Sequence, residues 1–157
     1  MEARLSPYTS PIMSKVFKHL SAASRLLREE STLPVATQEL VLLRVSQING
    51  CGFCVDMHFK DAVHEGEEPT RLNLVAAWRE ATVFTDAERA ALELAEHGTR
   101  LADGAGVADE VWENAAKHYD EEQLAALVCL ISLINAFNRG NVLTRQPAGG
   151  YQVGQFR

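Results

Sequence analysis

The chain has 157 residues, of which 46% are hydrophobic and 23% are charged. These fractions are typical of a globular protein, and the length suits one ordinary core, so we expect a single domain over residues 1–157. The formal net charge of −6, without a basic stripe, argues against nucleic acid as a partner. No apolar run has the length of a secretory signal or a bilayer-spanning helix, which predicts a cytoplasmic protein with no membrane partner.

The chain begins with a segment that lacks any regular pattern. Pro7 and Pro11, with Ser and Thr between them, predict an irregular N-terminal arm over residues 1–11. Apolar residues with a helical period then predict a first helix over about residues 12–29.

The second helix is predicted to be buried. Ser31-Thr32 offers a cap for it, and Pro34 lies near its start, where a missing N–H costs nothing. The helix is apolar over most of its circumference, as buried helices usually are. Glu39 and Arg44 lie in this helix and therefore need partners inside the protein.

Helical patterns also account for the rest of the chain. Further helices are predicted over about 52–65, over about 69–80, from the capping box Thr85-x-x-Glu88 onward, over about 108–118, and from Asp120 onward. No alternating strand pattern of useful length appears. We therefore expect an all-α fold with about seven helices, and expect the third cysteine, Cys129, to be a small buried hydrophobe in the last helix.

The most informative stretch is a Cys51-x-x-Cys54 pair at the start of the third helix, just after an Asn-Gly break. On a helix, Cys51, Cys54 and His58 fall within roughly a 60° arc of one face. Glu39 joins them if the second helix folds back along the third. Two thiols, an imidazole and a carboxylate in one patch indicate redox chemistry.

A thiol becomes nucleophilic when its thiolate is stabilised. A helix N-terminus and a nearby imidazolium both lower a cysteine pKa, from about 8.5 to roughly 3.5–7.5. The helix dipole favours Cys51 as the more acidic thiol, whereas the position of His58 one turn further on favours Cys54. The spacing does not decide which of the two attacks a substrate.

Two other interpretations use the same residues. Cys51, Cys54, His58 and His64 have the spacing of a zinc ligand set. On a continuous helix, however, His64 lies roughly 20 Å along the axis and about 140° around from Cys51, so the four side chains cannot converge. The second interpretation is purely structural, with two buried cysteines next to a core histidine.

The run Glu39-x11-Cys51-x-x-Cys54-x-x-x-His58 resembles the AhpD-type alkylhydroperoxidase motif of the carboxymuconolactone decarboxylase superfamily. The later Asn135-x-x-Asn138-Arg139 is also similar to that family, as are the segments Leu43-Arg44-x-Ser46-x-x-Asn49-Gly50, Trp78-Arg79 and Phe84-Thr85-x-x-Glu88-Arg89. The likeness covers about residues 12–145 and implies the AhpD-like helical fold.

The resemblance implies that Cys54 is the peroxide-reactive thiol and Cys51 its disulfide partner, with Glu39 and His58 as a proton relay. An organic hydroperoxide would be reduced to an alcohol, and an external dithiol, a dihydrolipoyl or thioredoxin-like protein, would reduce the Cys51–Cys54 disulfide. No metal, haem or flavin cofactor is needed. A compact chain of this kind suggests a homo-oligomer, a trimer or hexamer. Phe53 stands where the best-known members have a second histidine.

The leading hypothesis is therefore a thiol-dependent peroxidase or disulfide oxidoreductase. The superfamily name also suggests decarboxylation or lactone chemistry, although the decarboxylases proper do not depend on a Cys-x-x-Cys. A third possibility is a non-enzymatic, oligomeric redox sensor, whose thiols would oxidise without turnover.

Overall fold

The structure is a computed structural model and describes residues 2–7, 9–104 and 106–155. Over these residues the chain forms seven α-helices and two short 3-10 helices, without a strand. The elements are α1 Pro11–Glu30, α2 Val35–Ile48, α3 Gly52–His64, α4 Pro69–Leu74, η1 Val75–Ala77, α5 Asp86–Thr99, η2 Leu101–Asp103, α6 Asp109–Ala116 and α7 Glu121–Thr144. The predicted all-α fold is confirmed.

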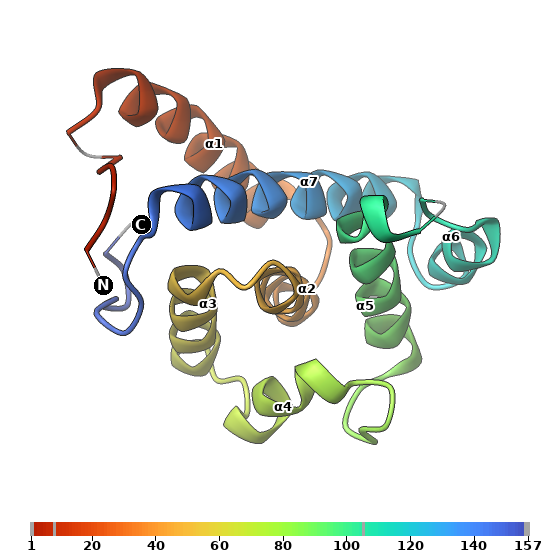
Figure 1. The fold of residues 1–157 in the computed structure, drawn as a ribbon. Coiled ribbons are helices and arrows are strands. Elements are labelled where there is room, and N and C mark those ends of the chain that lie inside the picture. The colour runs from red at the N-terminus through yellow and green to blue at the C-terminus, as the bar shows by residue number, and fades with distance from the viewer. Residues whose placement is uncertain (1, 8, 105, 156–157) are drawn as a thin grey trace.

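Helix α2 lies at the centre of the molecule. Figure 1 looks nearly along its axis and shows α3, α7, α5 and α4 around it. Nine of its fourteen residues are buried. Val41 and Val45 pack into a cluster shared with α5, α6 and α7, whereas Leu40 and Leu43 pack toward α4. Because α2 is enclosed, its polar side chains must find partners within the protein.

Helix α7 packs against α1, α2 and α5. It begins at a capping box in which Asp120 accepts from the backbone of Gln123 and the Gln123 side chain accepts from the Asp120 N–H. By length and composition α7 is apolar enough to cross a membrane, so the expectation that no segment reaches this length is wrong. A core helix passes the same test, and 44% of the apolar window of α7 is buried within the protein.

Residues 69–80 do not form the single helix that was predicted. Helix α4 ends at Leu74, and the chain tightens into η1. Val75 and Trp78 are both buried. Three residues make one turn of a 3-10 helix, so this tighter winding brings residues three apart to the same side. The burial of both Val75 and Trp78 thus favours the tighter 3-10 winding over a continued α-helix.

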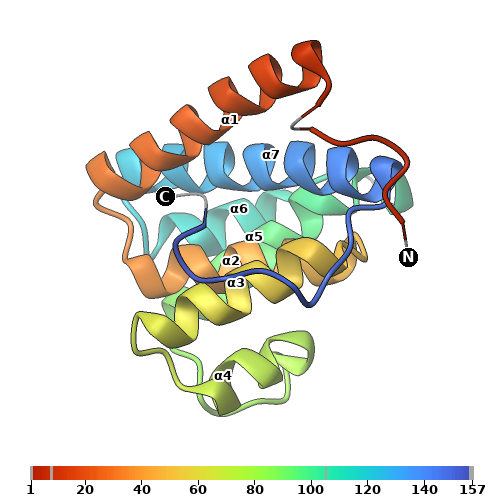
Figure 2. The same cartoon turned by 90° about the vertical axis from the view of Figure 1, so that its left-hand side faces the viewer.

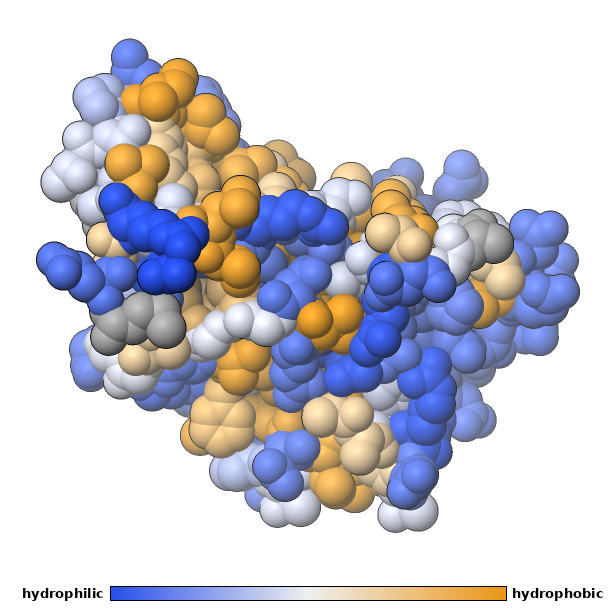
Figure 3. Space-filling view, viewed as in Figure 1, coloured by the Kyte–Doolittle hydropathy of each residue, from blue (hydrophilic) through white to orange (hydrophobic). Residues whose placement is uncertain are grey.

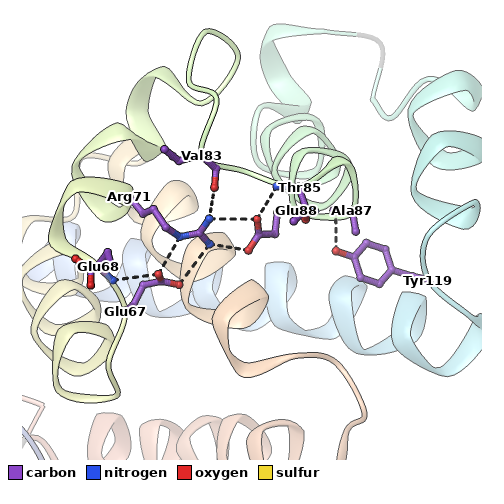
Figure 4. A network of polar contacts seen from close by, with 8 residues as sticks. All are labelled: Glu67, Glu68, Arg71, Val83, Thr85, Ala87, Glu88 and Tyr119. Atoms are coloured by element: carbon purple, nitrogen blue, oxygen red, sulfur yellow. Dashed lines mark hydrogen bonds and ion pairs between the residues drawn. The ribbon is translucent and has the colours of Figure 1, made fainter.

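A network of charged groups joins α4 to the start of α5 (Figure 4). Nη2 of Arg71 lies 2.7 Å from Oε1 of Glu88, and Nε of Arg71 lies 2.9 Å from Oε1 of Glu67. Arg71 also donates to the carbonyl of Val83. Glu88 meanwhile accepts from the backbone N–H of Thr85, and the Thr85 hydroxyl accepts from the N–H of Glu88. The predicted capping box is confirmed.

The buried charge of Arg44 on α2 also has its expected partner. Nη2 of Arg44 lies 2.5 Å from Oε1 of Glu96 on α5. Glu96 also accepts from Trp78 Nε1 at 2.9 Å and from Arg79 Nη1 at 2.6 Å. Burial alone would raise the pKa of Glu96, but the hydrogen bonds from Trp78, Arg79 and Arg44 lower it below its ordinary value.

Helix α1 is the outermost helix, and none of its residues is buried. The N-terminal end of α1 lies farther from α7 than its C-terminal end does (Figure 2). Helix α1 also presents an apolar surface (Figure 3). Ile12, Val16 and Leu26 are exposed on it. The two helices approach closely where Phe17 packs against Gly140. A Cβ at position 140 would lie 2.5 Å from the phenyl ring, so glycine permits this approach.

The connection between α1 and α2 differs from the prediction. Ser31 and Thr32 do not cap α2, whose N-cap position is held by Pro34 without a side-chain hydrogen bond. Ser31 is instead the C-cap of α1, where its N–H donates to the carbonyl of Leu27. The Ser31 hydroxyl contacts α2 through a side chain, since it accepts from Nε2 of Gln38 at 3.4 Å.

Cys129 is exposed, which contradicts its predicted burial. Its neighbours Leu127 and Leu130 are buried, whereas Val128 is exposed. Helix α7 is apolar all round, so its pattern does not reveal which face lies against the core.

The N-terminal segment contacts the end of α7, where the N–H of Arg4 donates to the carbonyl of Thr144 at 2.8 Å. Residues 2–7 and 9–10 lie outside any helix, as predicted for the arm; Pro11 already belongs to α1, and Met1 and Tyr8 fall outside the described residues. The C-terminal segment crosses α3 (Figure 2). There the hydroxyl of the buried Tyr151 donates to Asp61 at 2.9 Å, and the backbone N–H groups of Gly149 and Tyr151 donate to Asp56.

We expect Glu96→Gln to destabilise the fold by about 3 kcal/mol, because it leaves the buried cation of Arg44 without its counter-charge. Urea unfolding at neutral pH measures this change. Glu113→Gln, at an exposed position, is the control and should change stability by less than about 0.5 kcal/mol. Equal effects of the two substitutions would contradict the importance of the pair.

Candidate active site

The two cysteines lie together at the start of α3. Cys51 is the N-cap residue, directly before the helix that begins at Gly52, and Cys54 lies in the first turn. Their Sγ atoms are 2.8 Å apart, and both residues are almost fully buried as free cysteines. The site is therefore a pair of adjacent, sequestered thiols.

His58 and Glu39 form the second part of the site. Helix α3 folds back along α2 through a turn in which Gly50 has a φ of 65°, a conformation that favours glycine. This brings Oε2 of Glu39 to 3.3 Å from Nδ1 of His58. Nε2 of His58 is buried and has no hydrogen-bond partner within the described part of the chain. That nitrogen is available to a proton or a substrate.

Arg28, on α1, is a member of the site that the sequence analysis missed. Its Nη1 lies 2.5 Å from Oε1 of Glu39, and its Nη2 pairs with Glu65. Burial alone would raise the pKa of Glu39, but hydrogen bonds and charges of His58 and Arg28 lower it below its ordinary value. Glu39 is therefore an anion held between two cationic or proton-donating groups.

Amide side chains from α7 form the other wall of the site. Nδ2 of Asn141 donates to Sγ of Cys54 at 3.3 Å. Asn138, which is fully buried, donates to the Ser46 hydroxyl at 3.1 Å and accepts from Asn49 Nδ2 at 3.0 Å. The sequence analysis noted Asn138 only within the resemblance and missed Asn141. A polar residue on the buried side of an apolar helix is the signal that points to both.

The thiols differ in acidity. Hydrogen bonds with Cys54, and to a smaller extent with the amides of Asn141 and Asn138, together lower the pKa of Cys51 to about 7 against the effect of burial. The same hydrogen bond raises the pKa of Cys54. One proton therefore leaves the pair near neutral pH, and the resulting charge is favoured on Cys51. This agrees with the helix-dipole argument.

The zinc ligand set is not assembled. His64 is exposed in the last turn of α3. Among the residues that the structure describes, no three His, Cys, Asp or Glu side chains are grouped so as to hold a metal ion.

The fold and the site together define a class. A helical domain whose third helix begins at a buried Cys-x-x-Cys, with a Glu–His pair beside it, is an AhpD-like protein. Residues 14–97 match the model of the carboxymuconolactone decarboxylase family, and the chain belongs to that family. Both expectations drawn from the sequence motif, the family and the fold, are confirmed.

Two relatives match this chain over most of its length. The uncharacterized protein YdfG of Bacillus subtilis is 45% identical over 111 residues, which cover 71% of this chain and 75% of YdfG. The crystal structure of ATU0492 from Agrobacterium tumefaciens, a protein of unknown function described as a candidate antioxidant-defence protein AhpD, has a TM-score of 0.87 at 32% identity. The match covers 96% of this chain and 100% of that one.

Solved structures of lower sequence identity have the same fold. The debrominase Bmp8 has a TM-score of 0.77 at 18% identity, over 89% of this chain and 73% of that protein. At this identity the likeness concerns the fold alone.

We expect one thiol of the reduced protein to ionise with a midpoint near pH 7, because the hydrogen bond with Cys54 lowers the pKa of Cys51 to about 7. The ultraviolet absorbance of the thiolate, followed against pH in a Cys129→Ser background, measures this midpoint without the exposed third thiol. A first ionisation above about pH 8.5, the value of an ordinary cysteine, would contradict the proposed stabilisation.

We expect Asn141→Leu to raise this midpoint by about one to two pH units. A hydrogen bond to a charged group contributes about 1.5–3 kcal/mol, and one pKa unit corresponds to about 1.4 kcal/mol. The rate of iodoacetamide alkylation at pH 7 should fall accordingly. Asn73→Leu, at an exposed position of α4, is the matched control and should leave the midpoint unchanged.

Proposed function

We propose that the protein is an oxidoreductase that reduces organic hydroperoxides with its own dithiol. The observation that carries this proposal is the arrangement of the two thiols, 2.8 Å apart, at the start of the helix that also bears His58, whose Nε2 has no hydrogen-bond partner among the residues that the structure describes. A dithiol of this kind can donate two electrons and end as a disulfide.

The proposed cycle begins when His58 Nε2 takes the proton of the Cys54 thiol. Sγ of Cys54 attacks the terminal oxygen of the hydroperoxide, the O–O bond breaks, and the alkoxide leaves as an alcohol with the proton from His58. Cys54 is then a sulfenic acid. The Cys51 thiolate attacks its sulfur, the S–S bond forms, and hydroxide leaves as water with a proton drawn from solvent. An external dithiol then reduces the disulfide by exchange.

The division of labour between the cysteines follows from this cycle. The resting charge on Cys51 suits its role as the resolving thiolate, because the step that forms the disulfide needs Cys51 ionised. Cys54 is protonated at rest and needs a base when the peroxide arrives. Glu39 holds Nδ1 of His58, which leaves Nε2 to act as that base.

Phe53 does not take part in proton transfer in this cycle. It packs against the buried core cluster that contains both cysteines. His58 is thus the imidazole that the proposed relay uses, and a slower peroxide reaction than in members with two histidines is expected.

The proposed partners follow from the burial of the thiols. Cys51 and Cys54 are only 2% and 1% exposed, so a reductant must bring its sulfur into the site. A dihydrolipoyl group on a flexible arm suits this requirement, and a thioredoxin-like protein is the other candidate. The exposed apolar side of α1 is proposed to be covered in a homo-oligomer, a trimer or hexamer, in the cytoplasm.

We expect the reduced protein to lose two hydrogens rapidly on mixing with cumene hydroperoxide, and dihydrolipoamide to restore them. Stopped-flow kinetics and mass spectrometry of the peptide containing both cysteines measure the two steps. Cys54→Ser should abolish turnover, whereas Cys51→Ser should react once and stop as a sulfenic acid. Cys129→Ser is the control and should keep full turnover.

Other outcomes would favour other functions. Full steady-state activity in both Cys54→Ser and Cys51→Ser would overturn the proposal. Activity on a lactone or carboxylate substrate after complete alkylation of the thiols would favour decarboxylase-type chemistry. Oxidation without turnover in any dithiol, together with a change of assembly state, would favour a redox sensor.

A further inference from the structure

The relay carboxylate has a second partner that lies outside the motif. One oxygen of Glu39 faces His58 Nδ1 at 3.3 Å, and the other faces Nη1 of Arg28 at 2.5 Å. Glu39 is 4% exposed, so water has little access to it. Arg28 is half-buried and belongs to α1, the helix that packs on the outside of the core.

We propose that Arg28 is a positioning residue of the thiol site: it fixes Glu39 as a permanent anion, so that Glu39 orients His58 while His58 alone carries the proton. This inference rests on the proposed function, in which His58 is the base. The contact with Arg28 also changes the role of Glu39 in the proposed proton relay, because a carboxylate bound to a guanidinium is protonated only at low pH. Glu39 is then a fixed anchor and passes no proton.

The charged groups around Glu39 leave Arg28 as its counter-ion. On α2 itself the other charged residue, Arg44, pairs with Glu96 of α5. At the C-cap of α3, Glu65 pairs with Arg28 and adds a second contact that holds the guanidinium in place. Among the groups of the site, His58 is the second partner of Glu39, and its ring is charged only when protonated.

The geometry of Arg28 also explains how a surface helix reaches the site. Arg28 lies in the last turn of α1, and its guanidinium bridges Glu39 of α2 and Glu65 at the C-cap of α3. Arginine presents its donors in a rigid planar fork, so a single side chain can bridge two carboxylates in this way. Lysine can supply the charge but not this fork.

The consequence for pH follows from the lowered pKa of Glu39. With Arg28 present, Glu39 stays ionised throughout the neutral range and the anchor is lost only in acid. Without Arg28, its charge and its hydrogen bond no longer oppose the effect of burial, and the pKa of Glu39 rises. Glu39 then takes up a proton at a higher pH than in the unaltered protein, and a neutral carboxyl no longer fixes the His58 ring.

The test is Arg28→Met in the full-length protein, with Arg25→Met as the matched control, since Arg25 is exposed on the same helix one turn earlier. Two profiles are measured against pH: kcat/KM for cumene hydroperoxide, and the rate of iodoacetamide alkylation of Cys54 in a Cys51→Ser, Cys129→Ser background, where His58 is the base for the remaining thiol of the site. In Arg28→Met the acid limb of both profiles should move to higher pH by about one unit, with about a tenfold loss at pH 6. Arg25→Met should leave both profiles in place.

Arg28→Lys should recover most of the loss at pH 6, because it restores the cation. A purely structural role would lower both rates equally at every pH, without moving the limb, and that result would overturn the proposal. Alkylation requires no peroxide turnover. If the protein reduces no peroxide, the alkylation limb still reports on Arg28, so the two proposals fail separately.

Discussion

The burial of polar groups on α2 is the constraint on which the rest of the structure depends. A helix enclosed on all sides cannot leave a charge or a hydrogen-bonding group without a partner, because an unpaired buried polar group costs several kcal/mol. Glu39 therefore draws in Arg28 and His58, Arg44 draws in Glu96, and Ser46 accepts from Asn138. These contacts fix α1, α3, α5 and α7 against one central helix, and the thiols lie at the start of α3 in contact with Asn141 of α7.

How much of the site the sequence predicts depends on how far apart in the sequence the contacting residues lie. Cys51, Cys54 and His58 lie on one helix, so their spacing alone places them on one face. Glu39 requires only that two consecutive helices fold back at the Asn-Gly turn, which short connections favour. Arg28 and Asn141 reach the site from α1 and α7 through tertiary packing. A polar residue in an apolar helix marks Asn141 as one that needs a partner, but no local pattern identifies the thiol site as that partner.

The fold shows the same limit. The apolar periodicity of the sequence predicts that the helices exist. The capping box at Thr85 predicts where α5 begins, because it depends only on hydrogen bonds between residues close in sequence. The break after Leu74 does not follow, since burial of Trp78 against Glu96 overrides a sequence with adequate helix propensity. The exposure of Cys129 does not follow either, because an apolar helix has no polar stripe to mark its outer face.

The anchored carboxylate has a consequence for the proton balance of the proposed cycle. Reduction of one hydroperoxide releases an alkoxide and then a hydroxide, and each needs a proton. His58 obtains the first from the Cys54 thiol. The proton of Cys51 has already left near neutral pH, and Glu39, held by Arg28, has none to give. With Phe53 in place of a second imidazole, the second proton must come from solvent through His58. Closure of the disulfide, rather than attack on the peroxide, is then the step that depends on water reaching a buried site.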